Sequence, residues 1–194
     1  MIKKLSLGVL LFVISFTAQA AVENWYTYWT LGIAGNKYPG EMNSSMNALE
    51  DVGGDRSQTS LEMLGFYIPN TDTSLLGFII SSTGDLVDFP GEGSIQVNTY
   101  LYSLSYMKFM GAEPGVGFYF RGDLGAARAV IIVDPVDGKK VSGESDWGAG
   151  VLGGIGYGFK VSEESRLLLG FNSTVKSIED ETYQAFMFTI GGLW

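Results

Sequence analysis

The sequence contains no histidine and no cysteine among its 194 residues. Without histidine, hydrolysis by a Ser-His pair, histidine-dependent acyl transfer and histidine-ligated metal sites are excluded. Without cysteine, the chain forms neither a disulfide framework nor the lipidated N-terminal cysteine of a bacterial lipoprotein. We therefore expect a protein that is not an enzyme, that holds no cofactor or metal, and that reaches a membrane only through its own fold.

A hydrophobic run long enough for a membrane-spanning helix is also missing. The chain opens MIKKLSLGVLLFVISFTAQA, with two lysines, about a dozen apolar residues and the small-residue sequence Ala18-Gln19-Ala20. A spanning helix needs about 17 to 25 apolar residues, whereas this order is typical of a secretory signal peptide. The pattern predicts a signal peptide at residues 1–20, cleaved between Ala20 and Ala21, and one domain at residues 21–194.

Basic residues are scarce, since 12 Lys and Arg stand against 21 Asp and Glu. Loss of the predicted signal peptide removes Lys3 and Lys4, which leaves 10 basic and 21 acidic residues and a net charge of −11. A nucleic-acid partner is not expected for such a chain. The acidic run Glu179-Asp180-Glu181 lies in an expected loop, where a solvated surface is our interpretation and divalent-cation bridging to lipopolysaccharide is the alternative.

Aromatic residues and glycine are abundant, with 12 Phe, 10 Tyr, 4 Trp and 27 Gly. Several segments alternate apolar and polar residues over ten positions or more, close to the nine to eleven of a tilted membrane-crossing strand. The connections alternate between long and short, except the last, as between extracellular loops and periplasmic turns. The pattern predicts an all-β fold, an eight-stranded antiparallel up-and-down transmembrane β-barrel. Its expected strands are 25–35, 58–68, 74–82, 95–108, 116–130, 146–160, 166–177 and 183–194.

The segment DWGAGVLGGIGYGFK shows the two faces of such a strand. Trp147, Tyr157 and Phe159 share one face with Val151 and Ile155, and glycines dominate the other face. Ten residues of strand span ~33 Å, or ~25 Å along the membrane normal at the usual tilt. We therefore expect Trp147 at one membrane interface and Tyr157 and Phe159 at the other.

The tripeptide Arg121-Gly122-Asp123 resembles an adhesion motif, but its flanks are those of a strand and not of a loop tip. Alternation places Arg121 and Asp123 on one face, away from lipid. Buried charges require partners. We expect a lumen charge network formed by Glu62, Arg121, Asp123, Arg166 and Lys176. An eight-stranded barrel is narrow enough for side chains to fill, although glycines on the sixth strand keep a channel possible.

The first long loop contains a helical pattern. Met42, Met46 and Leu49 recur at the spacing of one helix face. Helices in loops usually bury their own apolar face. We expect a short helix that packs over the mouth of the barrel, with partner binding as the alternative.

The alternating strands, the strand GFYFRGDLG and the terminal strand AFMFTIGGLW resemble the small outer-membrane β-barrel family of the OmpA membrane domain and OmpX. The resemblance covers residues 21–194. It implies that the last strand is the recognition signal for the barrel-assembly machinery, which assigns Phe186, Phe188, Ile190 and Trp194 to that role. Family members commonly end in phenylalanine, whereas this chain ends in tryptophan.

Three functional hypotheses remain open at this point. The first is a monomeric, non-enzymatic barrel in a Gram-negative outer membrane, in contact with lipid and lipopolysaccharide, with a structural or surface-interaction role. The second is a narrow channel for ions or small apolar solutes. The third is a soluble periplasmic β-barrel that binds an apolar ligand.

Overall fold

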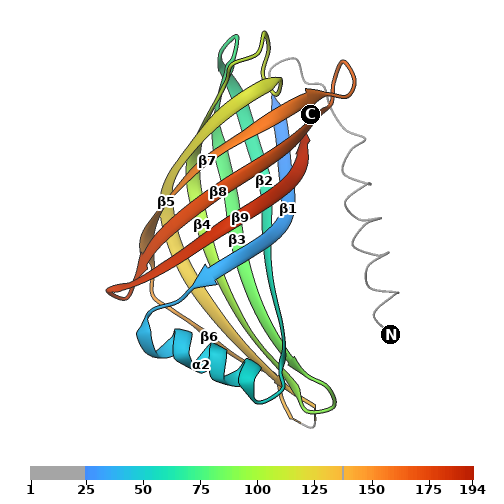
Figure 1. The fold of residues 1–194 in the computed structure, drawn as a ribbon. Coiled ribbons are helices and arrows are strands. Elements are labelled where there is room, and N and C mark those ends of the chain that lie inside the picture. Colours follow the sequence, from blue (N-terminus) through green and yellow to red (C-terminus); the bar gives the residue numbers. More distant parts are fainter. Residues whose placement is uncertain (1–24, 137) are drawn as a thin grey trace.

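The computed structural model describes residues 25–136 and 138–194, which form a closed antiparallel β-barrel of eight long strands and one short helix (Figure 1). The predicted eight-stranded up-and-down barrel is confirmed. A ninth, four-residue strand extends one wall. The elements are β1 (Tyr26–Lys37), α2 (Gly40–Asp51), β2 (Asp55–Thr71), β3 (Ser74–Phe89), β4 (Gly93–Phe109), β5 (Gly117–Pro135), β6 (Val141–Glu144), β7 (Gly148–Lys160), β8 (Arg166–Ile178) and β9 (Glu181–Leu193).

The barrel closes because the first strand pairs with the last. In the sheet order β4-β3-β2-β1-β9-β8-β7-β5, each strand pairs with its neighbour, and β4 pairs with β5 to complete the ring. At the seam, Tyr28 stands opposite Leu193 and Ile33 opposite Phe188. Thr27 of β1 and Trp194, the residue after β9, also exchange two backbone hydrogen bonds of 2.7 and 3.1 Å. A closed ring leaves no open sheet edge along its wall.

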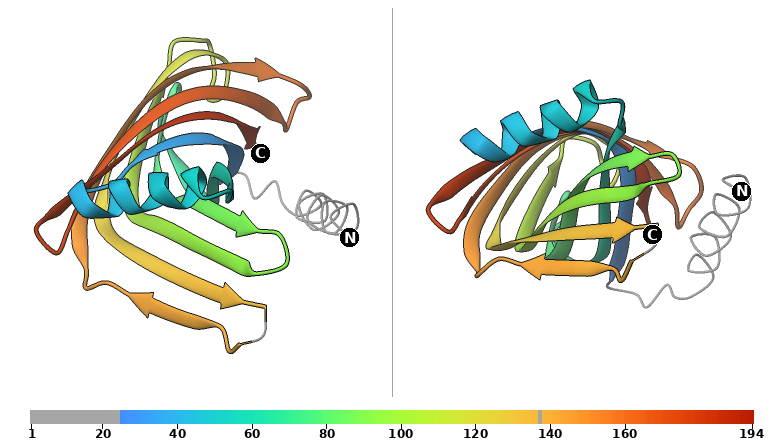
Figure 2. Two further views of the ribbon diagram at one scale, coloured as in Figure 1. Left: turned by 60° about the horizontal axis from the view of Figure 1, so that its bottom comes forward. Right: turned by 90° about the horizontal axis from the view of Figure 1, so that it is seen from below.

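The two ends of the barrel differ. The C-terminus and the start of β1 lie at one end, here called the termini end, whereas α2 lies at the other, the α2 end (Figure 1). The predicted loop helix is confirmed: α2 buries Met46, packs Met42 and Leu49 against the inner wall, and lies across one side of the mouth (Figure 2). No helix among the described residues is long and apolar enough to cross a membrane.

Several strands are longer at the α2 end than their sequence suggests. The expected loop at residues 83–94 is wrong, because β3 continues to Phe89 and β4 begins at Gly93. The expected loop at residues 131–145 is wrong in part, because β5 runs to Pro135 and β6 follows. The β-branched residues valine and isoleucine account for both extensions of the sheet. Ile95 pairs with Val87 and Val133, which continues the sheet beyond the length that a membrane requires.

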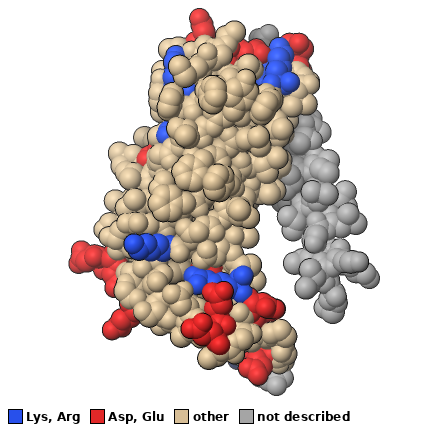
Figure 3. Space-filling model, in the orientation of Figure 1, with Lys and Arg blue, Asp and Glu red and all other residues tan. Residues whose placement is uncertain are grey.

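Alternation separates the inner face of the wall from the outer face. Along β7, Gly150, Leu152 and Gly158 are buried, whereas Val151 and Ile155 are exposed apolar residues. On the face shown in Figure 3, charged side chains gather mainly at the two ends, with a broad uncharged band between them.

A bulge in β2 accounts for the irregular alternation of that segment. The register with β1 and β3 shifts around Met63 and Leu64, and Leu64 has a positive φ of 53°. Two consecutive residues therefore avoid the inner face, as expected at a β-bulge. Inward positions change from even numbers, such as Glu62, to odd numbers, such as Tyr67.

Candidate functional site

A buried ion cluster crosses the lumen in its termini half. Arg121 on β5 donates from Nη1 to both carboxylate oxygens of Glu62 on β2, at 2.8 Å each. Its Nε atom donates to the two oxygens of Asp123 at 3.0 and 3.1 Å. All three side chains are buried. The guanidinium thus joins β5 to β2 across the lumen and is held by two carboxylates, a geometry that suits the planar fork of arginine.

Hydroxyl groups complete this cluster. Glu62 also accepts hydrogen bonds from Tyr28 Oη at 2.9 Å and from Thr30 Oγ1 at 2.7 Å, and Asp123 accepts one from Ser105 Oγ at 2.5 Å. The Arg121 guanidinium lies 5.4 Å from the centre of the Tyr28 ring. Buried carboxylates require such donors to offset the loss of water. Sequence reasoning did not foresee these hydroxyl partners, which come from β1 and β4.

Two apolar clusters fill the lumen on either side of the ions. The termini half contains Tyr28, Tyr67, Leu75, Ile79, Met107, Phe109, Tyr119, Leu168 and Leu193. The α2 half contains Tyr38, Met46, Val87, Val97, Leu101, Ala127, Ala129, Leu152, Ile178, Tyr183 and Met187. Several of these side chains have no exposed area. An interior of this width filled by side chains is the usual state of an eight-stranded barrel.

The inward glycines of β7 do not leave an open passage. A Cβ atom on Gly156 would lie 2.4 Å from Cζ of Tyr119, and one on Gly150 would lie 2.9 Å from Cδ1 of Leu101. On Gly154 it would lie 2.0 Å from Oδ1 of Asn172. The space that these glycines provide is occupied by large side chains from other strands. These glycines therefore give little support to a channel.

Lys176 on β8 faces the α2 half of the lumen and stands apart from the ion cluster. Its Nζ atom donates to Thr99 Oγ1 at 2.7 Å and to the Thr99 carbonyl at 3.5 Å. Among the described residues no carboxylate lies within 4.0 Å of this amine. The side chain is 2% exposed. The α2 half of the lumen therefore holds a buried basic side chain, and the anionic partner that sequence reasoning expected for it is absent from the described residues.

Arg166 also lies apart, at the termini end. It donates from Nη1 to the carbonyl oxygens of Ser162 and Glu163 at 3.1 and 3.0 Å, and its Nη2 atom pairs with Glu113 at 3.2 Å. Arg166 thus ties two turns together. Its stem packs on Gly115, where a Cβ would lie 2.4 Å from Arg166 Cγ and where φ is +81°. Of the five predicted network residues, three come together, and Lys176 and Arg166 have separate settings.

Sequence reasoning missed an ion pair at the α2 end. Arg56 Nη2 pairs with Asp85 Oδ2 at 2.7 Å, and its Nη1 atom donates to Asn47 Oδ1 of α2 at 2.9 Å. Asp85 also accepts from Gln58 Nε2 at 2.7 Å and is fully buried. Because Arg56 bonds both to Asn47 of α2 and to Asp85 of β3, it fixes the helix to the wall. Burial, with the Asp85 carboxylate nearby, raises the pKa of the Tyr38 phenol well above its ordinary value.

A signal for this pair was present. Arg56, Gln58 and Glu62 lie at even positions of one strand, and all three face inward. The expected strand began at residue 58, which left Arg56 in a loop, and Asp85 fell in the expected loop after β3. Continued alternation beyond the membrane length would have placed both on the inner face.

The predicted interfacial aromatics lie at opposite ends of β7 and point outward. Tyr157 and Phe159 are exposed at the termini end, and the Tyr157 ring lies 4.9 Å from that of Phe118. Trp147 precedes β7 at the α2 end, with its ring 5.4 Å from that of Tyr102. These positions suit the two aromatic girdles of a membrane barrel.

The residues assigned to the assembly signal lie on the outer face of β9 and just beyond it. Phe186, Phe188 and Ile190 are exposed, and Trp194 stacks on Trp29 of β1 with ring centroids 5.6 Å apart. The predicted cleavage positions Ala20 and Ala21 lie outside the described residues.

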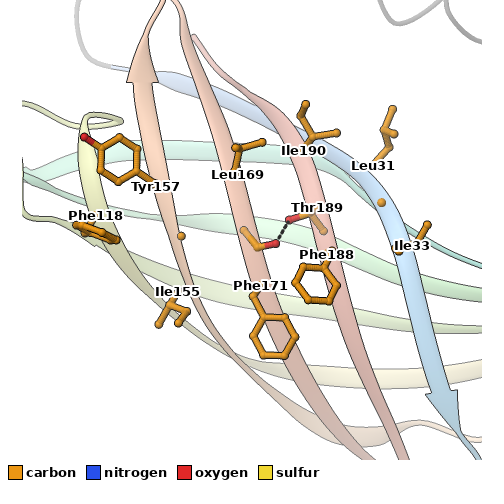
Figure 4. A pocket seen from close by; sticks show the side chains of 13 residues that line it. Leu31, Ile33, Phe118, Ile155, Tyr157, Leu169, Phe171, Phe188, Thr189 and Ile190 are labelled. Carbon is orange, nitrogen blue, oxygen red and sulfur yellow. Dashed lines mark hydrogen bonds between the residues drawn. The ribbon is translucent and has the colours of Figure 1, made fainter.

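A shallow hollow of about 790 Å³ lies on the outer face of the wall (Figure 4). Its surface is almost entirely apolar and is formed by β1, β5, β7, β8 and β9. It contains no cluster of ionisable groups, so nothing there suggests chemistry beyond contact with apolar matter. Its lining residues are Leu31, Gly32, Ile33, Phe118, Ile155, Gly156, Tyr157, Leu169, Gly170, Phe171, Phe188, Thr189 and Ile190.

Comparison with solved structures identifies the class of fold. The crystal structure of Ail, the attachment invasion locus protein of Yersinia pestis, in complex with the heparin analogue sucrose octasulfate, matches with a TM-score of 0.53 at 10% identity. A second Ail crystal structure gives 0.50 at 12% identity, and both matches cover 88% of this chain and 99% of that chain. Neisserial surface protein A gives 0.49 at 16% identity, over 87% of this chain and 95% of that chain.

The sequence matches no model of a protein family and no curated protein. The structure nevertheless has the fold of the small eight-stranded outer-membrane β-barrels, in agreement with the resemblance seen in the sequence.

Proposed function

We propose that the protein is an integral outer-membrane β-barrel with a closed lumen, and that it has a structural or surface-interaction role. In this proposal the α2 end faces the outside of the cell and the termini end faces the periplasm, as in the usual topology of such barrels. The uncharged band between the charged ends supports membrane insertion. Exposed apolar residues of the strands, such as Leu104, Phe120 and Leu124, suit contact with lipid.

The observation that carries the closed lumen is the ion cluster of Glu62, Arg121 and Asp123. It joins β5 to β2 across the lumen and is enclosed by apolar clusters toward both ends. A path for ions or apolar solutes would have to break these contacts and leave buried charges unpaired. The narrow-channel hypothesis is therefore the less favoured one.

An adhesive role for the Arg-Gly-Asp sequence is not supported. Arg121 and Asp123 are 4% and 5% exposed and are bonded to each other within the lumen. An adhesion motif has to be presented to its receptor on an accessible loop. A surface role would instead depend on the α2 end, where the long strands and the helix lie.

Lipid and lipopolysaccharide are the proposed partners of the outer wall, and the outer hollow is a surface that acyl chains would cover. The outward row of Phe186, Phe188 and Ile190 on β9 is the proposed contact for the barrel-assembly machinery. The protein is proposed to act as a monomer, because the eight strands close the barrel within a single chain.

Electrophoresis of the outer-membrane fraction in mild detergent tests this proposal. Closed membrane barrels resist unfolding until heated, so we expect unheated and boiled samples to migrate at different positions. The matched control is the soluble periplasmic fraction of the same cells. Recovery in that fraction, with no mobility difference on heating, would contradict the proposal and favour a soluble barrel that binds an apolar ligand.

A further inference from the structure

The hollow on the outer wall lies between two rows of large apolar side chains (Figure 4). Each row is a line of exposed cross-strand partners on β5, β7, β8, β9 and β1. The first row, here called ridge A, consists of Phe120, Ile155, Phe171, Phe188 and Ile33. The second row, ridge B, lies two residues nearer the termini end on every strand and consists of Phe118, Tyr157, Leu169, Ile190 and Leu31.

Residues without an outward side chain form the floor between the two ridges. Gly156, Gly170, Thr189 and Gly32 are cross-strand partners in that order. Thr189 points inward, where its Oγ1 atom accepts a hydrogen bond from Asn172 Nδ2 at 3.3 Å. Two residues of strand separate the ridges by ~7 Å, a width that admits one extended hydrocarbon chain. The hollow is therefore part of a groove that crosses the strands.

The groove descends from the termini end toward the middle of the wall. Phe118 and Phe120 lie near the start of β5, whereas Ile33 is the eighth residue of the 12-residue strand β1. Five strands ~4.8 Å apart give a groove ~19 Å long, which descends ~12 Å along the membrane normal at the usual strand tilt. Half of a bilayer's hydrocarbon core is ~15 Å thick. The groove can thus hold most of one acyl chain within a single leaflet.

A lysine stands where ridge A reaches the termini end. Lys108, the exposed cross-strand partner of Phe120, lies on β4 one residue before the end of that strand. Its Nζ atom donates to Thr73 Oγ1 in the turn between β2 and β3 at 2.6 Å, and no carboxylate of the described residues lies within 4.0 Å of it. An ammonium group has three donors, so two remain for a ligand. The groove therefore begins beside an exposed cation.

Charge decides which lipid suits the groove. Lys160, at the same end, already pairs with Glu113 at 3.2 Å and with Glu163 at 2.9 Å, whereas the amine of Lys108 has no such partner among the described residues. An ammonium group attracts an anion and repels another cation. A phospholipid that has a phosphate and no amine, such as phosphatidylglycerol, therefore matches Lys108 with its headgroup and the two ridges with an acyl chain.

We propose that this groove binds one anionic phospholipid from the leaflet at the termini end. The phosphate lies on Lys108, and one acyl chain lies between ridges A and B. In the orientation proposed above, this leaflet faces the periplasm and consists of phospholipid, whereas lipopolysaccharide forms the outer leaflet. The inference deepens the proposed membrane function and rests on it, because a barrel outside a membrane would meet no such leaflet.

Native mass spectrometry of the folded barrel, released from nonionic detergent micelles, tests the headgroup contact. The probe is palmitoyl-oleoyl phosphatidylglycerol, and phosphatidylcholine with the same acyl chains is the comparison. We expect one phosphatidylglycerol to bind saturably and more tightly than phosphatidylcholine. Lys108→Gln should weaken phosphatidylglycerol binding by about threefold to tenfold. The matched variant Lys37→Gln removes an exposed lysine at the α2 end and should bind as the wild type does.

A second pair of variants tests the acyl-chain contact. Leu169→Ala lowers ridge B at its centre, and we expect the same lipid to bind about fivefold to tenfold more weakly because apolar contact is lost. Leu124→Ala removes an equally large side chain from the outer face of β5, outside the groove. That variant should bind as the wild type does.

Three outcomes would overturn the proposal. The first is the absence of a saturable single lipid, and the second is wild-type affinity in either Lys108→Gln or Leu169→Ala, which would indicate general contact between lipid and the wall. The third is a dimer mass that Leu169→Ala abolishes, which would assign the groove to a second copy of this chain. The mobility difference on heating, measured on the same samples, separates a failure of lipid binding from a failure of the barrel proposal.

Discussion

In the half of the lumen near the chain termini, Arg121 lies between two buried carboxylates, whereas in the half near α2, Lys176 donates to two oxygen atoms of Thr99 and to no other described residue. Both cations are almost completely buried. A paired charge is costly to remove singly, because its partners are left without compensation. A buried basic group without an anionic partner loses its hydration and gains little electrostatic stabilisation in exchange. The same barrel thus contains one basic side chain that joins two strands across the lumen and one that has no carboxylate partner among the described residues.

The largest change in stability is expected at Arg121, the paired cation. We expect Arg121→Met to lower the free energy of unfolding by about 3–5 kcal/mol, because Glu62 and Asp123 would remain buried without their cation. Urea unfolding in phospholipid vesicles, followed by tryptophan fluorescence, measures this loss. Arg121→Lys is the control, since it keeps the charge but loses the bidentate geometry, and its loss should be smaller. Unchanged stability in Arg121→Met would contradict the role given to the cluster.

The packing of the termini half can be tested at Gly156. We expect Gly156→Ala to lower the free energy of unfolding by about 1–3 kcal/mol, because the new Cβ would press on Tyr119 and on the Leu169 carbonyl. The matched control is Gly153→Ala on the outer face of the same strand, where a Cβ meets nothing within 4 Å. Equal stabilities for the two variants in the same urea titration would show that the lumen has room beside Gly156.

The smallest expected effect, and the one of opposite sign, is at Lys176. Lys176→Met removes an amine that lacks a carboxylate among the described residues, so we expect a gain in the free energy of unfolding of about 1–2 kcal/mol. Thr99 would keep the hydrogen bond that joins its hydroxyl to that of Thr83 at 2.9 Å. The same titration measures the change. A clear loss of stability would contradict the view that the buried amine of Lys176 destabilises the barrel.

The sequence was sufficient for the parts of the molecule that depend on local periodicity. Alternation along β5 and β7 predicted the barrel, placed Arg121 beside Asp123 on an inner face, and gave Tyr157 an outward direction. Each of these follows from a period of two within a single strand. The helix α2 was predictable for the same reason, because Met42, Met46 and Leu49 mark one helix face.

The rest depended on contacts between distant strands. Nothing near Lys176 in the sequence indicates that Thr99 lies across the lumen from it, and the partners Arg56 and Asp85 are 29 residues apart. The bulge at Leu64 reversed the inner face of β2, and Gly65, which follows it, does not stand out in a sequence with 27 glycines. Strand ends were missed because a membrane length was taken as the limit, whereas pairing beyond the membrane is decided by the neighbouring strands.

The central claim, that side chains close the lumen, is tested most directly by electrical recording from the purified barrel in a planar lipid bilayer. The account predicts no stepwise conductance above the background of the bilayer across the voltage range that the bilayer tolerates, because the ion cluster of Glu62, Arg121 and Asp123 leaves ions no path. Reproducible, steady conductance steps from folded wild-type protein would contradict this account and establish the narrow-channel function in its place.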